Sequence, residues 1–420
     1  MPEGVVHVIG AGLAGLSSAL RLASGGQKVR LWEASGHAGG RCRSFDDAGL
    51  GRRIDNGNHL VLTGNRSVRG YLDLAGARGA LRPTPGADFP FVDLPTGRRW
   101  TVRLNGGPLP WWIASPGRRI PDTGIGDYLA GFGLALAGPE TTVAEAVRDR
   151  GPLWHRFWEP LTLAALNTTP EKGAAQLLWR VLRETFARGA AHARPMFAPQ
   201  GLGDALVAPA LSRLAGLGAE ITYFATLDHV SDDGSRATGL TFKDGRVEVL
   251  GPADRVVIAL PPARLGTVFP AMDLPGDTHA ILNAHFVLPE GALPPDLPPF
   301  LGLIGSRTHW IFTRGDVVSL TISAADQMDI LGGDREHVLE ILWSETRKAL
   351  NLGEIGYQNG RILTERRATF DQSPSGVAKR PDASTALHNM FLAGDVTDTG
   401  LPATIEGAIR SGETAAHLAA

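Results

Sequence analysis

Residues 5–15 have the sequence VVHVIGAGLAG, an apolar run followed at once by three glycines spaced Gly-x-Gly-x-x-Gly. An uninterrupted apolar run such as Val5–Ile9 is typical of a strand buried on both faces of a parallel sheet. Leu13–Ala23 follows with leucines at helical spacing, and Lys28–Trp32 resumes a strand. The first 33 residues therefore predict one strand–helix–strand unit of a doubly wound α/β fold.

The glycine loop of this unit predicts a dinucleotide site. Gly10 permits the tight turn, Gly12 lets the backbone approach a pyrophosphate, and Gly15 lets the helix pack close to the sheet. The helix then begins at Leu13, where free N–H groups and the helix dipole hold phosphate charge. Glu33 ends the second strand 23 residues after Gly10, placed to accept hydrogen bonds from a ribose diol.

Composition excludes several classes of protein. The 420 residues exceed one ordinary domain, and 41 basic against 43 acidic residues leave a net charge of −2. No basic run supplies the phosphate-neutralising surface that nucleic-acid binding needs, so no nucleic-acid partner is expected. The single cysteine, Cys42, excludes a disulfide framework and a thiolate metal cluster. We therefore expect no metal site and a reducing, cytoplasmic location.

Targeting and membrane-spanning segments are not expected. The sequence from Met1 to Glu3 lacks the positive start of a signal peptide. The longest uncharged run, between Arg103 and Arg118, holds 14 residues, whereas a spanning helix needs about 20 apolar residues.

Two further motifs identify the nucleotide. Residues 39–44, GGRCRS, place paired glycines beside Arg41, a fixed cation for phosphate or flavin oxygens. Gly394 and Asp395 follow an apolar strand near the C-terminus, and residues 402–408, PATIEGA, open a helix whose N-terminus would face the pyrophosphate or the flavin. These motifs resemble those of the FAD oxidoreductases that include amine oxidases and carotenoid desaturases. FAD is the expected cofactor.

The arrangement of elements indicates an interleaved chain. Helices are expected at Gly203–Leu217 and Ile405–Ala416, with strands at Ala219–Phe224, Arg255–Leu260 and Met390–Ala393. A tryptophan-rich, mostly helical stretch covers residues 108–198, with a capping box at Thr142–Glu145, and strand signals occupy residues 83–102 and 279–323. We predict a Rossmann-like FAD-binding domain of residues 1–82, 199–275 and 366–420, and an α+β substrate domain of residues 83–198 and 276–365.

Longer stretches narrow the resemblance. Residues 54–59 (IDNGNH), 158–161 (WEPL), 164–168 (AALNT) and the tail from Gly400 to Gly412 are similar to the hydroxysqualene dehydroxylases, the squalene-associated FAD-dependent desaturase-like family of hopanoid biosynthesis. The likeness covers essentially the whole chain. Asn58 departs from the family, where glutamine is expected. The resemblance implies FAD contacts at Gly10, Gly12, Leu13, Ala14, Gly15, Glu33, Ala34, Gly39, Gly40, Arg41, Asn56, Gly57, Val230, Gly394, Asp395, Ala403, Thr404 and Ile405.

The same resemblance implies reductive removal of the allylic hydroxyl of hydroxysqualene to give squalene. The protein would then orient the alcohol, protonate its oxygen and exclude water. His59 is the first candidate acid because imidazole titrates near neutral pH, but it is also explained by backbone hydrogen bonds. Asp55 would serve as the acid in an apolar pocket, or it caps a turn. Asn167 would bind the hydroxyl, or it caps the end of its helix.

An apolar isoprenoid substrate needs an apolar tunnel. Trp154, Phe157, Trp158 and Leu161 have helical spacing and are expected on one helix face, either as ordinary core or as a wall of that tunnel. Residues 109–113 and 128–136 are uncharged, and they are expected either as a patch entering the membrane interface or as a buried domain interface. The first alternative predicts a cytoplasmic protein, peripheral on the inner membrane.

Three rival functions share these motifs. An amine oxidase is disfavoured because Cys42 is far from the C-terminal flavin helix and no lysine lies between Lys243 and Lys348. A carotenoid or phytoene-type desaturase would run the hydride in the opposite direction, and the sequence separates it poorly. A prenyl-lipid escort protein on the same fold would lack redox chemistry. No second Gly-x-Gly-x-x-Gly follows a strand, so an external electron donor is expected, of unknown identity.

Overall fold

The computed structural model describes residues 4–148 and 150–420. Its N-terminal unit consists of β1 (Val5–Ile9), α1 (Leu13–Ser24) and β2 (Lys28–Trp32), which confirms the predicted strand–helix–strand order. A parallel five-stranded sheet is built around this unit in the order β10-β2-β1-β14-β20. Its other strands come from much later in the chain: β10 (Glu220–Thr222), β14 (Arg255–Ile258) and β20 (Met390–Leu392).

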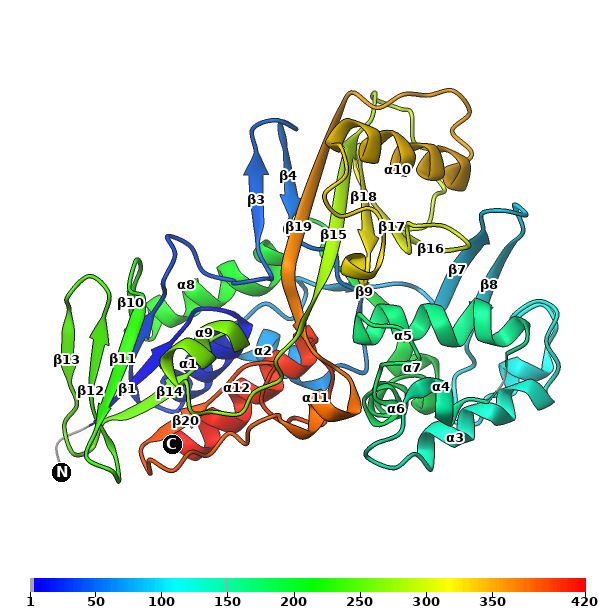
Figure 1. Cartoon of the computed structure of the whole chain (residues 1–420). Coiled ribbons are helices and arrows are strands. Elements are labelled where there is room, and N and C mark those ends of the chain that lie inside the picture. Colours follow the sequence, from blue (N-terminus) through cyan, green and yellow to red (C-terminus); the bar gives the residue numbers. More distant parts are fainter. Residues whose placement is uncertain (1–3, 149) are drawn as a thin grey trace.

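Helices cover one face of this sheet (Figure 1). The C-terminal helix α12 (Ile405–Ala419) lies against α1, and an added Cβ at Gly412 would be 2.2 Å from the Ala14 carbonyl oxygen, so the two helices approach closely. The same apolar cluster includes residues of α2 (Arg66–Leu74) and of α8 (Ala208–Gly216), which continues from a π-helical turn at Gly203–Val207. The opposite face carries a three-stranded sheet and a short helix: β11 (Leu227–Asp232), β12 (Ala237–Phe242), β13 (Val247–Val249) and α9 (Pro262–Val268).

A second, seven-stranded sheet has the order β19-β15-β18-β17-β16-β7-β8. Helix α10 (Arg335–Leu350) packs against it. Figure 1 shows its two longest strands running side by side from the upper sheet down to the region of the parallel sheet. The strands are β7 (Asp88–Asp93), β8 (Arg99–Arg103), β15 (Thr278–Val287), β16 (Phe300–Ile304), β17 (Trp310–Arg314), β18 (Val317–Ile322) and β19 (Asn359–Phe370).

The tryptophan-rich stretch forms a third region of short helices, and its capping box at Thr142 and Glu145 is present as predicted. Residues 154–158 form a π-helical turn before α5, and i→i+5 bonding shifts the side chains around the axis. All four side chains expected on one helix face belong to one hydrophobic cluster: Trp154 and Trp158 are buried in the core, whereas Phe157 and Leu161 pack against it and line a cavity. The α-helices of this region are α3 (Phe132–Ala135), α4 (Val143–Ala146), α5 (Glu159–Leu166), α6 (Ala175–Glu184) and α7 (Ala190–Ala193).

Two small sheets join these regions. A hairpin of β3 (Ser44–Asp47) and β4 (Arg52–Asp55) follows the arginine motif, and β9 (Pro195–Phe197) pairs with both β5 (Val61–Leu62) and β6 (Arg82–Pro83). The expected domain boundaries at 82/83 and 365/366 fall inside β6 and β19, and the division into domains stays a prediction. Within residues 4–148 and 150–420, no helix combines the length and apolarity needed to cross a bilayer.

Candidate active site and cofactor site

A cavity of about 670 Å³ lies beyond the carboxyl ends of β1, β2 and β14, and we call it the glycine-lined cavity. Motifs from opposite ends of the chain meet here. Of the residues expected to contact FAD, the following line it: Gly10, Gly12, Leu13, Ala14, Glu33, Ala34, Gly39, Gly40, Arg41, Gly394, Asp395, Ala403, Thr404 and Ile405.

The two glycine loops lie against each other in this cavity. The Gly39 N–H donates to the Ala11 carbonyl over 2.8 Å, and a Cβ added at Gly40 would be 3.4 Å from the Gly12 Cα. A Cβ added at Gly12 would meet no atom within 4 Å, so its backbone borders open space. An extended phosphate group fits such a bare backbone, which supports a dinucleotide here.

Glu33 is fixed in the wall of the cavity by two backbone donors. Its Oε2 accepts from the Ala11 N–H and its Oε1 from the Ser35 N–H, both over 2.8 Å. The Ser35 hydroxyl, with one proton, lies 2.9 Å from Glu33 Oε1 and 2.7 Å from the His37 carbonyl oxygen. An ionised carboxylate has about four acceptor positions. At least one position therefore remains for a ribose hydroxyl.

Arg41 and Asp395 connect the two ends of the chain. Arg41 Nη2 lies 2.6 Å from Asp395 Oδ1, and Arg41 Nη1 donates to the Ala368 carbonyl over 2.6 Å. Asp395 is 4% exposed. The guanidinium is therefore held at a set position beside the cavity, as expected of a cation that binds phosphate or flavin oxygens.

A second cavity of about 270 Å³, the apolar cavity, adjoins the first. Its walls come from the seven-stranded sheet and the helical region, with aromatic side chains at Phe89, Phe91, Phe157, Phe186, Trp310 and Phe312. The two cavities share a set of lining residues, which form their junction: Arg41, His59, Glu365, Ala368, Thr369, Ala403, Thr404 and Ile405.

His59 lies at this junction, as a candidate acid should. Burial lowers its pKa from 6.5 to about 4, and Arg41 adds to this effect, while Asp55 opposes it. The imidazole is therefore neutral at pH 7, because loss of hydration disfavours the charged form.

Asp55 and Asn167, the other two candidates, are committed to structural bonds. Asp55 lines neither cavity; its oxygens accept from the Ser44 hydroxyl, the Leu202 N–H and Arg314 Nη1, the last two over 2.9 and 2.7 Å. Asn167 lines the apolar cavity, but it is the left-handed cap that ends α5, and both ends of its amide have protein partners. The placement of Asp55 does not support a proton-donating role, and Asn167 fulfils the alternative role of a cap.

Four expected FAD contacts lie outside the glycine-lined cavity. Gly15 is inside α1, where an added Cβ would be 1.8 Å from the Gly10 oxygen, so it provides close packing. Asn56 and Gly57 line the apolar cavity instead. Val230 is buried in the core of β11, and the residues just before that strand, together with its first residue Leu227, line the cavity in its place. The β-bulge after Leu227 shifts the side-chain alternation of this strand.

The structure also places three carboxylates in the apolar cavity that the sequence did not single out. Glu365 of β19 lies at the junction, and Glu184 and Glu406 belong to α6 and α12. Alternation along β19 predicts that Glu365 lies on the opposite face of the strand from its sequence neighbours. Its position near the flavin motifs, however, depends on how β19 pairs with β15. No local motif contains that information.

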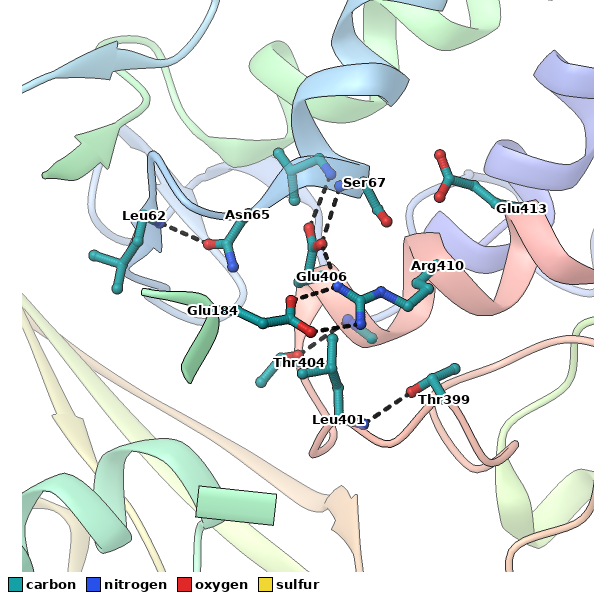
Figure 2. A network of polar contacts seen from close by, with 12 residues as sticks. Leu62, Asn65, Ser67, Glu184, Thr399, Leu401, Thr404, Glu406, Arg410 and Glu413 are labelled. Atoms are coloured by element: carbon teal, nitrogen blue, oxygen red, sulfur yellow. Dashed lines mark hydrogen bonds and ion pairs between the residues drawn. The ribbon is translucent and has the colours of Figure 1, made fainter. Parts of the chain in front are cut away.

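Glu184 and Glu406 form a network with Arg410 (Figure 2). Glu406 accepts from the N–H groups of Ser67 and Val68 at the start of α2, both over 3.0 Å, and from Arg410 over 3.0 Å. Arg410 also contacts both Glu184 oxygens over 3.0 and 2.6 Å. This network fixes the first turn of α12 against α2 and α6, beside the junction.

Comparison with known proteins identifies the family. A model of the flavin-containing amine oxidoreductases matches residues 13–419. The chain is 42% identical to a hydroxysqualene dehydroxylase of Rhodopseudomonas palustris, over 98% of this chain and 97% of that protein. It is also 42% identical to one of Sinorhizobium fredii, over 100% and 99%. The chain belongs to the hydroxysqualene dehydroxylase family of flavin-containing oxidoreductases. This membership confirms the expected oxidoreductase class and the expected cofactor, FAD.

Solved structures confirm the fold of this family member. Cyclohexylamine oxidase from Brevibacterium oxydans superposes with a TM-score of 0.74 at 14% identity, covering 100% of this chain and 99% of that one. Putrescine oxidase bound to putrescine gives a TM-score of 0.68 at 14% identity, covering 99% and 98%. The α/β fold with a Rossmann-like FAD-binding part and an interleaved α+β part is as expected.

Proposed function

We propose that this protein removes the allylic hydroxyl of hydroxysqualene and replaces it with hydrogen to give squalene. The observation that carries the proposal is the direct contact between an apolar cavity and a cavity lined by the dinucleotide motifs. Relatives that match over nearly their whole length bear the corresponding name. A long hydrocarbon alcohol suits aromatic walls with few polar groups.

The residues of the apolar cavity suit cleavage of a carbon–oxygen bond. When bound in its reduced form, FAD supplies a hydride to the carbon that loses oxygen. The oxygen leaves with its bonding electrons and takes up a proton, so that the products are squalene and water. Phe157, Phe186 and Trp310 line the cavity, and apolar walls of this kind exclude water that would otherwise capture the allylic cation.

Two titratable side chains at the junction are candidates for the proton donor. His59 is the first, and its lowered pKa makes its protonated form a stronger acid than free imidazole. Glu365 is the second, because this residue lines both cavities. Both side chains lie where a hydroxyl in the apolar cavity would approach the flavin motifs.

The decisive experiment is anaerobic turnover of hydroxysqualene by the photoreduced holoenzyme, with the product identified by mass. We expect squalene and stoichiometric flavin reoxidation. Phytoene with the oxidised holoenzyme is the matched test for a desaturase. Flavin reduction by phytoene without conversion of hydroxysqualene would contradict the proposal.

We further propose that residues 109–136 contact a membrane surface to collect this water-insoluble substrate. This segment contains exposed large apolar side chains, and the ring contact of Trp112 with Tyr128, 5.3 Å between centroids, joins its two halves. Figure 1 shows the segment at the outer edge of the helical region. Arg118 and Arg119 lie between its two uncharged stretches, 109–113 and 128–136, and suit anionic headgroups. The exposed side chains are Leu109, Trp111, Ile125, Leu129, Phe132 and Leu136.

Hydrogen bonds connect the exposed segment to the chain that forms part of the apolar cavity. Ala190 donates to the Asn105 carbonyl over 2.9 Å, and Asn105 Nδ2 donates to the Leu109 carbonyl over 2.8 Å. Residue Phe186, four positions before Ala190, lines the cavity. The exposed segment is therefore held against an element that forms part of the cavity wall.

Sedimentation with vesicles tests the membrane contact. The holoenzyme with Trp111→Ser and Phe132→Ser should lose about tenfold or more of its binding to phosphatidylcholine vesicles containing phosphatidylglycerol. Val249→Ser removes an apolar side chain that is at least as exposed, elsewhere on the surface, and should leave binding unchanged. Equal binding by both variants would contradict the proposal.

A further inference from the structure

A hydrogen-bonded network of side chains lies in the wall of the apolar cavity. It joins the loop after β4 to strands β15 and β18, because Asn283 and Thr321 are paired across the sheet and Asn58 reaches them from the loop. Thr321 Oγ1 donates to Asn283 Oδ1 over 3.0 Å, and Asn58 Nδ2 donates to Thr321 Oγ1 over 3.2 Å. Asn283 Nδ2 donates to the Asn56 carbonyl over 3.4 Å.

The bonds of this network fix the orientation of both amides. Asn58 Nδ2 also contacts the Leu320 carbonyl over 3.4 Å, and a carbonyl only accepts, so the amide nitrogen faces the sheet. Among the residues that the structure describes, no donor reaches Asn58 Oδ1, and Asn283 Nδ2 uses one of its two hydrogens. One acceptor and one donor thus remain on two residues that line the cavity.

The network lies next to the junction of the two cavities. A Cβ built on Gly57 would be 3.6 Å from both Asn283 Nδ2 and His59 Nε2, so the amide and the imidazole flank the same glycine. A group bound by Asn283 is therefore adjacent to the side chain proposed as proton donor. The surrounding walls are apolar, with Ile281 on β15 and Phe312 on β17, the strand next to β18.

We propose that Asn58, Asn283 and Thr321 form the binding site for the substrate's hydroxyl and so select an allylic alcohol over the corresponding hydrocarbon. The proposal rests on the proposed function, in which the substrate is a hydroxylated triterpene. The alcohol O–H donates to Asn58 Oδ1, and the free N–H of Asn283 donates to the alcohol oxygen. Thr321 acts as a positioning residue that holds both amides in this orientation.

This arrangement also favours release of the product. Squalene lacks the hydroxyl, so its binding leaves both amide groups without a partner in an apolar cavity. A site built to bind a hydroxyl discriminates strongly against a ligand without one for the same reason. The holoenzyme should therefore bind hydroxysqualene at least about tenfold more tightly than squalene.

The test measures binding to the oxidised holoenzyme without a reductant, so that no turnover occurs. Hydroxysqualene and squalene are titrated in identical detergent micelles, and the change in visible flavin absorption reports each dissociation constant. Asn58→Leu has nearly the shape of asparagine without its amide, and it should reduce the preference for the alcohol to about threefold or less while leaving squalene affinity unchanged. Thr321→Val should weaken the preference in the same direction.

Two variants provide controls. Asn58→Gln keeps an amide and should retain a preference for the alcohol above that of Asn58→Leu. Asn65→Leu removes an amide that lines the same cavity outside the network, and its ratio of affinities should equal that of the wild type. The melting temperature and bound flavin of each variant show whether it is folded.

The outcomes separate this inference from the proposed function. Equal binding of the two ligands by the wild type, or an undiminished preference in folded Asn58→Leu, overturns the hydroxyl site even if hydroxysqualene is reduced to squalene. Binding of neither ligand overturns the proposed function together with the site. A preference that is present in the wild type and in Asn65→Leu but lost in Asn58→Leu supports the site.

Discussion

Arg41 and Asp395 lie 2.6 Å apart although 354 residues separate them in the chain. Each belongs to a motif that indicates a flavin, and each restricts the other's position in the glycine-lined cavity. The Asp395→Asn variant removes the charge that holds Arg41. We expect lower FAD occupancy after reconstitution and at least about tenfold weaker binding, equivalent to 1.4 kcal/mol. Asp398→Asn, in the same loop but more exposed, is the control, and equal flavin contents in the two variants would contradict this expectation.

Gly12 has room for a methyl group but faces the cavity that would hold a pyrophosphate. The Gly12→Ala variant should therefore fold, with a melting temperature close to that of the wild-type apoprotein, and lose FAD affinity by about tenfold or more. Gly79→Ala also adds a methyl group in open space, outside the cavity, and should leave affinity unchanged. Flavin fluorescence titration measures both. Wild-type affinity in Gly12→Ala would place the phosphate elsewhere.

Glu406 is 4% exposed and accepts two backbone N–H groups and a guanidinium (Figure 2). Glu406→Ala leaves these donors unpaired in the interior, so we expect a loss of roughly 2–4 kcal/mol in the free energy of unfolding. Glu413→Ala, on the same helix, removes a partly exposed ion pair with Arg21 and should cost at most about 1 kcal/mol. Urea unfolding followed by circular dichroism checks both. Similar losses would show that the network contributes little.

His285 connects pH to stability. It is fully buried, and desolvation lowers its pKa from 6.5 to about 4, with Arg314 contributing in the same direction and Asp55 and Asp47 opposing. The imidazole binds a proton more tightly in the unfolded chain than in the folded one. This histidine therefore costs no stability above pH 6.5, and the free energy of unfolding falls as the pH decreases toward 4. The loss amounts to roughly 3 kcal/mol at most for one such group. His285→Gln should flatten this part of the stability profile, and an unchanged slope would contradict the assignment.

His59 should determine the pH dependence of the proton-transfer step. With a pKa of about 4, its protonated fraction rises about tenfold for each pH unit from pH 7 down to pH 5. Single-turnover rates of the prereduced enzyme should increase accordingly, and His59→Gln should remove the increase. If the increase persists in His59→Gln and disappears in Glu365→Gln, the carboxyl group is the donor.

Local sequence predicted the first unit of the fold closely. Val5–Ile9 and Lys28–Trp32 are strands with the expected bounds, and the glycine spacing placed Gly10 and Gly12 at the cavity. These features depend on residues that are close together in the sequence. They are an apolar run, a glycine in a backbone conformation that other residues rarely adopt, and free N–H groups at the start of a helix. By contrast, the π-helical turn at Trp154–Trp158 was missed, because a slip of helical register leaves no mark in the spacing of apolar residues.

The amino-acid sequence by itself determined the nucleotide-binding unit and, through its resemblance, the family, because those signals are carried by contiguous residues. Only the tertiary structure decided how Glu365, Asn283 and Thr321 approach His59. These residues come from three strands, and the register of β15 with β18 and β19 decides which side chains meet. Strand register depends on pairing between distant segments, so a polar group at a cavity junction has the same local sequence signature as one on a solvated strand.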